Sequence, residues 1–416
     1  MRKLFGLWAI DGPLVGAVVI LSLIGLAMIF SAVNTIDPDP SIARVWVRQG
    51  IWFVLALAAF TAVSRVPQRW LEWVAMPGYV FGLVLLGLTL AFGTGAGTAA
   101  GTRSFIELAG FRFQPAEPAK IATILALAQY LSTRAEAPGN LRDVIVPGMI
   151  AAAPLGLVLL QPDLGTAQAF VGILFAMLFW AGTPVPIRLL LASPLPALIL
   201  AFDARIWAVY IVLVGVALYL LRYRLFFYES VAVIFANFAA GTIANPLWNT
   251  LEPYQKSRLL VFIDPQLDPR GQGWNIIQSK VAIGSGGLTG QGYLEGTQKR
   301  FNFLPEQHTD FIFSVVGEEF GFIGVVVALA LFSFVLWRLV QLAADTSDPF
   351  AGLALLGIFG AWFTHIFVNV GMTIGLVPVT GIPLPFISYG GSFLLMSWVA
   401  LAIAVRVAHD GSRSRA

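Results

Sequence analysis

Twelve apolar segments, separated by polar connections, dominate this sequence. A helix needs about 20 apolar residues to cross a bilayer, and turn residues with amphipathic flanks can complete a shorter segment. The sequence therefore predicts an all-α polytopic integral membrane protein with about twelve transmembrane helices, all in a single membrane domain, 1–416. The apolar segments are 14–33, 51–63, 74–92, 116–131, 144–160, 166–181, 189–202, 206–221, 231–243, 311–339, 351–376 and 393–407.

The composition supports a lipid environment and excludes several classes of protein. Hydrophobic residues make up 58% of the chain and charged residues 11%, which leaves too few polar side chains to cover a water-facing surface. No cysteine is present, so disulfides, thiol chemistry and cysteine zinc sites are excluded. The net charge of +3 is spread over many short loops, and we therefore expect no nucleic acid partner.

The basic residues of the short loops predict the orientation in the membrane. Arg2 and Lys3 precede the first apolar segment, which lacks a small-residue cleavage site and is read as a retained helix. With a cytoplasmic N-terminus, most loop Arg residues fall inside, as the positive-inside rule requires. Both termini are then cytoplasmic and the long loop 249–310 faces outward. These inside residues are Arg65, Arg69, Arg134, Arg142, Arg188, Arg222, Arg224, Arg338, Arg406, Arg413 and Arg415.

Residues 249–310 form a polar, glycine-rich loop between apolar helices. The loop carries two Asp-Pro pairs, at Asp264 and Asp268, and basic residues that include Arg270 and Lys280. We interpret it as an extracytoplasmic active-site loop at the boundary between water and lipid. An Asp-Pro pair can also simply start a turn, and that simpler reading suits Asp264 better than Asp268.

Four ionisable residues elsewhere are expected on the same outer side as this loop. Glu117 and Lys120 are three residues apart at the start of a helix, where they share one face and can pair. Asp163 lies at a break between two helices, where it can cap the second by accepting a free N–H. An ion pair and a helix cap would explain these three residues structurally. Together with Arg103, however, they are expected on the same outer side, which favours one shared polar cavity. Such intramembrane charges are costly and usually functional.

Other motifs carry little chemistry. The stretch 284–292, GSGGLTGQG, matches no nucleotide-binding fingerprint and more simply permits a close approach of backbones. His308 could be a metal ligand or a base, but three histidines without a zinc motif make a histidine-built zinc site improbable. Ser388 lacks the nucleophile elbow of a serine hydrolase.

Several long motifs nevertheless resemble one known family. They are FQPAEPAK (113–120), QPDLGTA (161–167), DPRGQGWNIIQSKVAIGSGG (268–287), FLPEQHTDFIFSVVGEEFG (303–321) and NVGMTIGLVPVTGIPLPFISYGGS (369–392). In this order they resemble the SEDS family (shape, elongation, division and sporulation) of bacterial cell-wall polymerases. GYLEGTQKRFNFLPEQHTD and TGIPLPFISYGG look more like the rod-shape, elongation branch than the division branch.

The resemblance implies a peptidoglycan glycosyltransferase that polymerises lipid II in the bacterial cytoplasmic membrane, with Asp268 as the essential carboxylate. Leaving-group charge would be balanced by basic residues or by a divalent cation, Mg²⁺ or Mn²⁺, on Glu117, Asp163 or Asp268. No organic cofactor is expected. The candidate substrate-binding residues are Arg103, Glu117, Lys120, Asp163, Arg270, Lys280 and His308.

The resemblance also implies partners: the growing glycan strand, a class B penicillin-binding protein that crosslinks it, and other proteins of the elongation complex. Residues 352–363, rich in small and aromatic side chains, are a candidate contact for the transpeptidase. Residues 184–246 hold three apolar segments where the family pattern has one, which predicts an insertion of two helices. A flippase for lipid-linked precursors, a division polymerase and a noncatalytic scaffold remain as alternatives.

Overall fold

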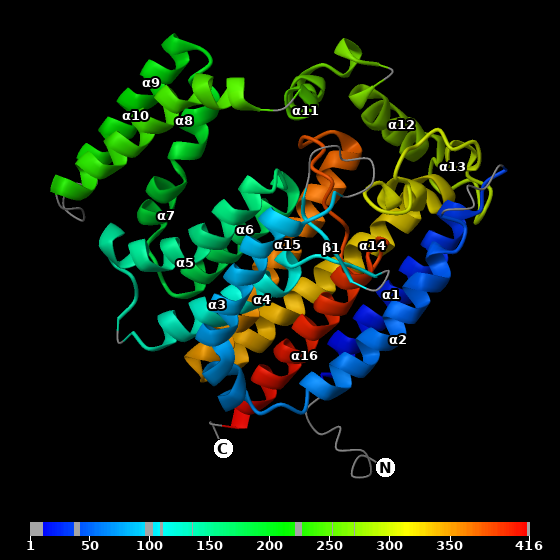
Figure 1. Cartoon of the computed structure of the whole chain (residues 1–416), viewed down its shortest axis with the longest axis horizontal. Coiled ribbons are helices and arrows are strands. Elements are labelled where there is room, and N and C mark those ends of the chain that lie inside the picture. Colours follow the sequence, from blue (N-terminus) through cyan, green and yellow to red (C-terminus); the bar gives the residue numbers. More distant parts are fainter. Residues whose placement is uncertain are drawn as a thin grey trace.

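The computed structural model describes residues 11–36, 42–95, 103–108, 111–134, 136–220, 227–251, 253–269 and 271–413. Nearly all elements are helices, arranged as a bundle with a smaller unit and a loop region beside it (Figure 1). The elements are α1 (Gly12–Val33), α2 (Val45–Val63), α3 (Gln68–Phe92), β1 (Ile106–Leu108), β2 (Phe111–Phe113), α4 (Ala116–Ser132), α5 (Leu141–Leu160), α6 (Leu164–Trp180), α7 (Val185–Ala192), α8 (Pro194–Leu200), α9 (Ala204–Leu220), α10 (Phe227–Thr250), α11 (Pro253–Ile263), the 3₁₀ helix η1 (Pro265–Leu267), α12 (Gln272–Ser285), α13 (Thr297–Arg300), α14 (Ile312–Asp345), α15 (Pro349–Ile374) and α16 (Gly391–Arg413).

The all-α membrane fold is confirmed. In the described part of the chain each of the twelve apolar segments is helical, and 189–202 is divided between the two short helices α7 and α8. Eight of the described helices are long and apolar enough to cross a membrane by themselves. The number of crossings therefore stays a prediction. A two-stranded antiparallel hairpin, in which Glu107 pairs with Arg112, adds a small β element before α4.

Helix α15 is the centre of the bundle. It packs against α4, α6, α14 and α16, and small residues let it approach its neighbours closely. A Cβ added to Gly360 would lie 2.5 Å from the carbonyl oxygen of Gly172 on α6. Side chains from Leu353 to Leu356 are at most 4% exposed. The predicted transpeptidase contact at 352–363 is therefore wrong, because most of this segment is buried inside the bundle.

Helices α7 to α10 form a unit that projects from the bundle, at the upper left of Figure 1. Its own small core contains Leu190, Val214, Leu218 and Val233. At the start of α10, the Tyr228 ring lies 3.9 Å from the Arg142 guanidinium of α5. The N–H of Arg142 also donates to Oε1 of Glu229, so the start of α10 is held against α5. That residues 184–246 are an insertion stays a prediction.

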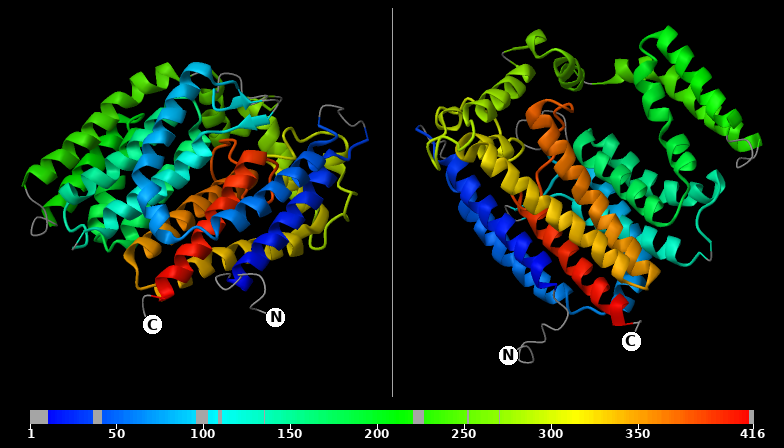
Figure 2. Two further views of the ribbon diagram at one scale, coloured as in Figure 1. Left: turned by 60° about the horizontal axis from the view of Figure 1, so that its bottom comes forward. Right: turned by 180° about the vertical axis from the view of Figure 1, so that it is seen from behind.

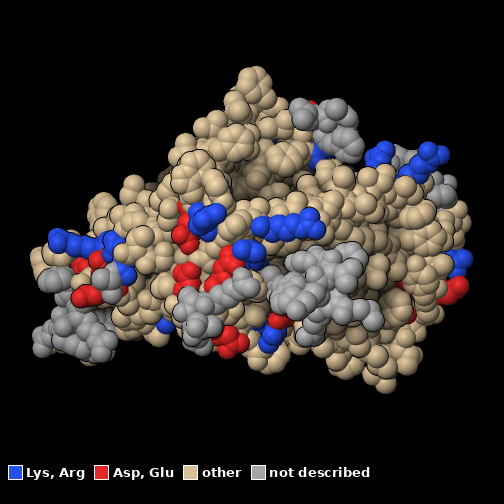
Figure 3. Space-filling model, turned by 90° about the horizontal axis from the view of Figure 1, so that it is seen from below, with Lys and Arg blue, Asp and Glu red and all other residues tan. Residues whose placement is uncertain are grey.

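Helix α1 begins and α16 ends at one end of the bundle, whereas α11, α12 and α13 lie at the opposite end (Figures 1 and 2). Figure 3 views the first of these ends and shows Lys, Arg, Asp and Glu side chains scattered among uncharged surface. Ion pairs join helices there: Arg338 of α14 binds Asp11 with a distance of 2.6 Å. The predicted active-site loop therefore lies at one end of the bundle, and the start of α1 and the end of α16 lie at the other.

Candidate active site

The second half of the 249–310 loop is built into the bundle. Gly286 and Gly290 lie against the backbone of α14, so that an added Cβ on either would come within 2.0 Å of a carbonyl oxygen. The N–H groups of Gln291 and Gly292 donate to the carbonyls of Glu318 and Glu319 at 3.0 Å. The glycine stretch thus permits close backbone approach, as the sequence predicts.

Two adjacent glutamates of α14 hold the rest of this half. Glu318 accepts hydrogen bonds from the backbone N–H groups of Gln298 and Lys299, which start the short helix α13. Glu319 pairs with Lys299 at 2.7 Å, and the Lys299 ammonium also reaches Ser31 of α1. These contacts fix residues 297–300 between α1 and α14.

The two Asp-Pro pairs have different surroundings. Asp264 caps η1, because its Oδ1 accepts from the N–H of Gln266 at 2.9 Å. Asp268 follows η1 and is half-buried, and its carbonyl accepts from the N–H groups of Gly271 and Gly273. Its carboxylate lies over Gly271, where a Cβ would come within 2.2 Å of Oδ2. Asp264 therefore has a turn-forming role, and Asp268 presents its carboxylate at a glycine turn.

The segment that carries Asp268 is held above the bundle by an apolar contact. Val261 of α11 and Ile276 of α12 pack with Phe311, Met372 and Val379, which belong to the ends of α14 and α15 and to the segment after α15. Together with η1, which packs on α11 and α12, this cluster places the Asp268 turn over the loop end of the bundle.

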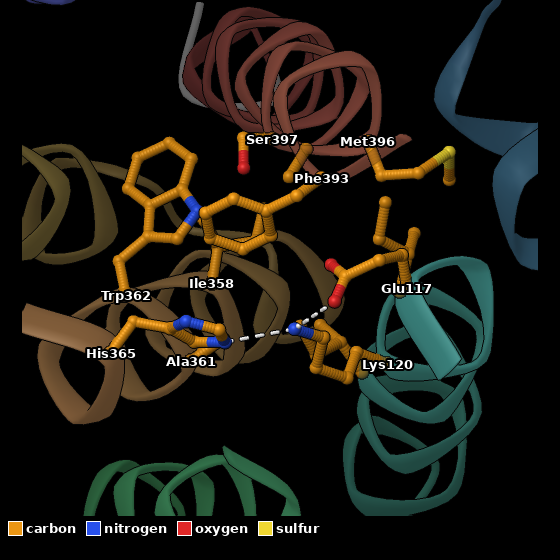
Figure 4. A pocket seen from close by; sticks show the side chains of 12 residues that line it. Glu117, Lys120, Ile358, Ala361, Trp362, His365, Phe393, Met396 and Ser397 are labelled. Atoms are coloured by element: carbon orange, nitrogen blue, oxygen red, sulfur yellow. Dashed lines mark hydrogen bonds and ion pairs between the residues drawn. The ribbon is translucent and has the colours of Figure 1, made fainter. Parts of the chain in front are cut away.

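Inside the bundle, Glu117 and Lys120 form a buried ion pair of 2.9 Å. On its other side Lys120 Nζ lies 2.8 Å from Nε2 of His365 on α15. Figure 4 shows the ammonium between the carboxylate and the imidazole, beside the ring of Phe393. A pocket of about 30 Å³ adjoins them, enough for about one water molecule. The predicted pairing of Glu117 with Lys120 is present, with a third partner that the sequence did not reveal.

Asp163 caps α6. Its Oδ1 accepts from the N–H of Thr166 at 2.9 Å, and its Oδ2 accepts from Gln114 Nε2 at 3.1 Å. Gln114 precedes α4, so this carboxylate links the starts of α4 and α6. The capping role expected from the sequence is therefore seen. In this position Asp163 is close enough to Asp310 to influence its charge.

A second group of charges lies where the loop joins α14. The pKa of the Asp310 carboxyl is raised to about 7, chiefly by burial and also by the negative charges of Glu306 and Asp163, whereas Arg258 of α11 opposes the shift. Burial also lowers the pKa of His308, and Glu306 opposes that shift. Asp163, from the bundle, and Arg258, from the loop, thus act on the same carboxyl group. Charges from the bundle and from the loop therefore meet at Asp310, and the polar cavity itself stays a prediction.

The remaining predicted residues lie at the edges of this region. Arg103 is exposed and its N–H donates to the carbonyl of Gln161. The Lys280 ammonium lies over Gly375, which ends α15 in a left-handed conformation with φ +76°, a position where the helix dipole favours a cation. The His308 ring lies tilted beside the Tyr389 ring, with ring centroids 5.6 Å apart. Arg270 lies outside the described residues.

A family profile covers almost the entire chain. The family FTSW_RODA_SPOVE, described as cell cycle protein, matches residues 13–413. The chain belongs to this family. As a member of the FtsW/RodA/SpoVE family, it is 34% identical to the peptidoglycan glycosyltransferase RodA of Treponema pallidum, over 93% of this chain and 94% of the relative. It is 33% identical to the peptidoglycan glycosyltransferase MrdB of Escherichia coli, over 85% and 82%.

Solved structures of the FtsW/RodA/SpoVE family share its fold. The rod shape determining protein RodA of Thermus thermophilus superposes with a TM-score of 0.63 at 27% identity, over 97% of this chain and 98% of that chain. A chain from a study of how a peptidoglycan synthase complex coordinates polymerization and crosslinking gives a TM-score of 0.71 at 32% identity, over the same shares.

The described side chains contain no ready-made cluster of metal ligands. Across the described ranges no three His, Asp or Glu side chains lie together as metal ligands would. Glu117 is engaged by Lys120, and both Asp163 oxygens accept hydrogen bonds from the protein. Because Mg²⁺ is usually held by one or two carboxylates with waters and substrate phosphates, binding of a divalent cation together with substrate stays a prediction.

Sequence reasoning missed four site residues of this family member: Glu306, Asp310, His365 and Asn369. Asn369 donates to the carbonyls of Asp310 and Ile382, and so ties α15 to the loop. Glu306 and Asp310 are four residues apart, directly before an apolar helix, a pattern that could have marked them. His365 and Asn369 are also four apart, and such spacing places both on one helix face.

Proposed function

We infer that this chain is a peptidoglycan glycosyltransferase that polymerises lipid II into glycan strands during cell elongation. Family membership over residues 13–413 and relatives of that name support the activity. The observation that supports the site is the position of the Asp268 turn on a loop that packs at Phe311, next to Asp310, and brings Arg258 close to that carboxyl group.

Asp268 is the proposed general base. The acceptor sugar hydroxyl attacks the anomeric carbon of the donor, and a carbon–oxygen bond forms while the bond to undecaprenyl pyrophosphate breaks. The hydroxyl proton passes to the Asp268 carboxylate. General base catalysis typically contributes about 10²- to 10⁴-fold. The glycine at position 271 leaves room beside this carboxylate, since a Cβ there would overlap it.

The leaving pyrophosphate needs positive charge. Among the described residues, Arg258 of α11 lies near Asp310 and Lys280 of α12 lies at the end of α15, and Arg103 is exposed. Lys120 is only 4% exposed and held by two partners, so we assign it to organising the cavity rather than to direct phosphate contact. No step of this proposal passes through a metal ion.

The proposed orientation is that the loop end of the bundle faces outward and both termini are cytoplasmic, in the bacterial cytoplasmic membrane. Lipid II then meets the site on the face where glycan strands are needed. A class B penicillin-binding protein is the proposed partner, since a structural neighbour comes from a study of coupled polymerization and crosslinking.

Polymerisation of lipid II by the purified protein, with a penicillin-binding protein present, tests the function. We expect glycan chains that disappear in the Asp268→Asn variant. Translocation of lipid II across vesicles without chain formation would instead identify a flippase.

A further inference from the structure

His365 lies on α15 with each ring nitrogen engaged. Nδ1 lies 3.0 Å from the carbonyl oxygen of Pro383, and Nε2 lies 2.8 Å from Nζ of Lys120. A carbonyl oxygen can only accept and an ammonium can only donate. The ring must therefore donate from Nδ1 and accept at Nε2, which is the neutral Nδ1–H tautomer.

This geometry fixes an otherwise flexible side chain. A lysine ammonium is a compact charge on a stem of four carbons, and Glu117 alone would leave two of its N–H groups to find partners. A polar group that is buried without a hydrogen-bond partner is strongly unfavourable. His365 accepts one of these N–H groups, and its ring is in turn stacked on Phe393 with centroids 4.8 Å apart. Nζ is thus held from α4, α15 and α16 (Figure 4).

The same face of α15 also contacts Asp310, just before α14. Asn369, one turn beyond His365, donates to the carbonyl of Ile382, the residue before Pro383. It also donates to the carbonyl of Asp310 at 2.9 Å. Hydrogen bonds on either side of the 382–383 backbone therefore link the Glu117–Lys120 pair, through His365 and Asn369, to Asp310, which precedes α14.

We propose that His365 is a positioning residue for the glycosyltransferase site, which holds the Lys120 ammonium and ties it to the 382–383 backbone beside Asp310. The expected effect on turnover rests on the proposed function. The His365 tautomer follows from the hydrogen bonds alone and is independent of that function. His365 contacts no substrate atom in this scheme and acts through Lys120. At metal sites, loss of the outer partner that orients a ligand typically costs about 10- to 100-fold in affinity or activity, and we expect a loss of similar size for the partner that orients Lys120.

Two variants separate hydrogen bonding from packing. His365→Gln keeps an acceptor and a donor at a similar separation, whereas His365→Leu keeps bulk and removes both. We expect His365→Leu to lower kcat by about 10- to 100-fold with little change in KM for lipid II, and His365→Gln to recover most of the loss. His409→Leu, at the opposite end of the bundle beside Asp410, is the matched control and should keep full activity. Unchanged turnover in His365→Leu, or equal loss in both His365 variants, would overturn the proposal.

Nitrogen NMR of the histidines gives a readout independent of activity. The chain has three histidines, and the signal lost in His365→Gln assigns the one in question. We expect a neutral ring protonated at Nδ1 throughout pH 6 to 8 in wild-type protein, and a change in that signal when Lys120→Met removes the donor. An imidazolium, or a ring protonated at Nε2, would refute the proposal. Failure of the wild-type enzyme to polymerise lipid II, with the expected tautomer present, would count against the proposed function only.

Discussion

The Lys299 ammonium binds the Glu319 carboxylate at 2.7 Å, and neither side chain is exposed to solvent. Ser31 of α1 completes the group, because its hydroxyl donates to Glu319 at 2.5 Å and its carbonyl accepts from Lys299 at 3.1 Å. This pair joins the loop to two helices of the bundle. Its role is structural, since it lies in the docked half of the loop rather than beside Asp268.

We expect Lys299→Met to destabilise the protein by about 3–5 kcal/mol, because it leaves a buried carboxylate without its cation. The double variant Lys299→Met with Glu319→Gln should recover much of that loss, since replacing both charges is often close to neutral. Thermal unfolding in detergent measures both variants. A single variant as stable as the wild type would contradict the structural role.

Asp268→Asn should retain the fold and lose at least about two orders of magnitude in polymerisation rate, because the amide cannot take up the proton of the attacking sugar hydroxyl. Asp264→Asn is the matched control. Asp264 caps η1, and asparagine caps a helix about as well as aspartate does, so polymerisation should be only mildly reduced. Initial rates with lipid II check both, and a near-normal rate for Asp268→Asn would remove it as the base.

Replacing Glu117 by Gln and Lys120 by Met together tests what the buried pair does. If the two charges only neutralise each other, the double variant should be stable and active. We expect it to be stable but to lose polymerisation, because the Lys120 ammonium also anchors the hydrogen bonds that lead through His365 and Asn369 toward Asp310. A stable and fully active variant would return the pair to a purely structural role.

Asp310 predicts a pH dependence of stability. Its pKa is raised from the ordinary 3.8 to about 7 by burial and by Glu306, so the folded state binds a proton that the unfolded state has released. This stabilisation is complete below about pH 4 and is lost as pH rises through about 7. The melting temperature of the wild type should therefore fall relative to that of Asp310→Asn between pH 4 and 7. Exposed Glu136→Gln should show the wild-type trend, and parallel curves for wild type and Asp310→Asn would refute the assignment.

The orientation can be tested with single cysteines, because the chain contains none. A cysteine at Gln266, on the loop, should react with an impermeant thiol reagent added to intact cells. A cysteine at Ser414, near the C-terminus, should be protected until the cells are opened. Equal protection of both positions would contradict the proposed topology.

The sequence was sufficient to predict the helices, because runs of apolar residues need no tertiary information to be recognised. It also paired Glu117 with Lys120 and made Asp163 a cap, since both rest on spacing along one helix. The burial of 352–363 was not predictable in this way. A helix in the middle of a membrane bundle and one facing lipid are both apolar, so only packing distinguishes them.

The missed site residues depend on contacts distant in sequence. His365 reads as one polar residue on an apolar helix until Lys120, 245 positions away, is placed beside it. Asp310 likewise acquires its raised pKa only when burial, Glu306 and Asp163 come together. Such groupings follow from tertiary packing, which no local pattern encodes.

The docked half of the loop has a consequence for the order of assembly. Lys299 contacts Ser31, 268 residues earlier, and depends on Glu319, which follows the loop. Ribosomes release the loop before α14, and contacts of long sequence separation form late because closing large loops costs entropy. Residues 286–310 therefore cannot settle against α1 until α14 has entered the membrane. A nascent chain that stops before α14 carries Asp268 but has no assembled site, so catalytic competence appears only near the end of synthesis.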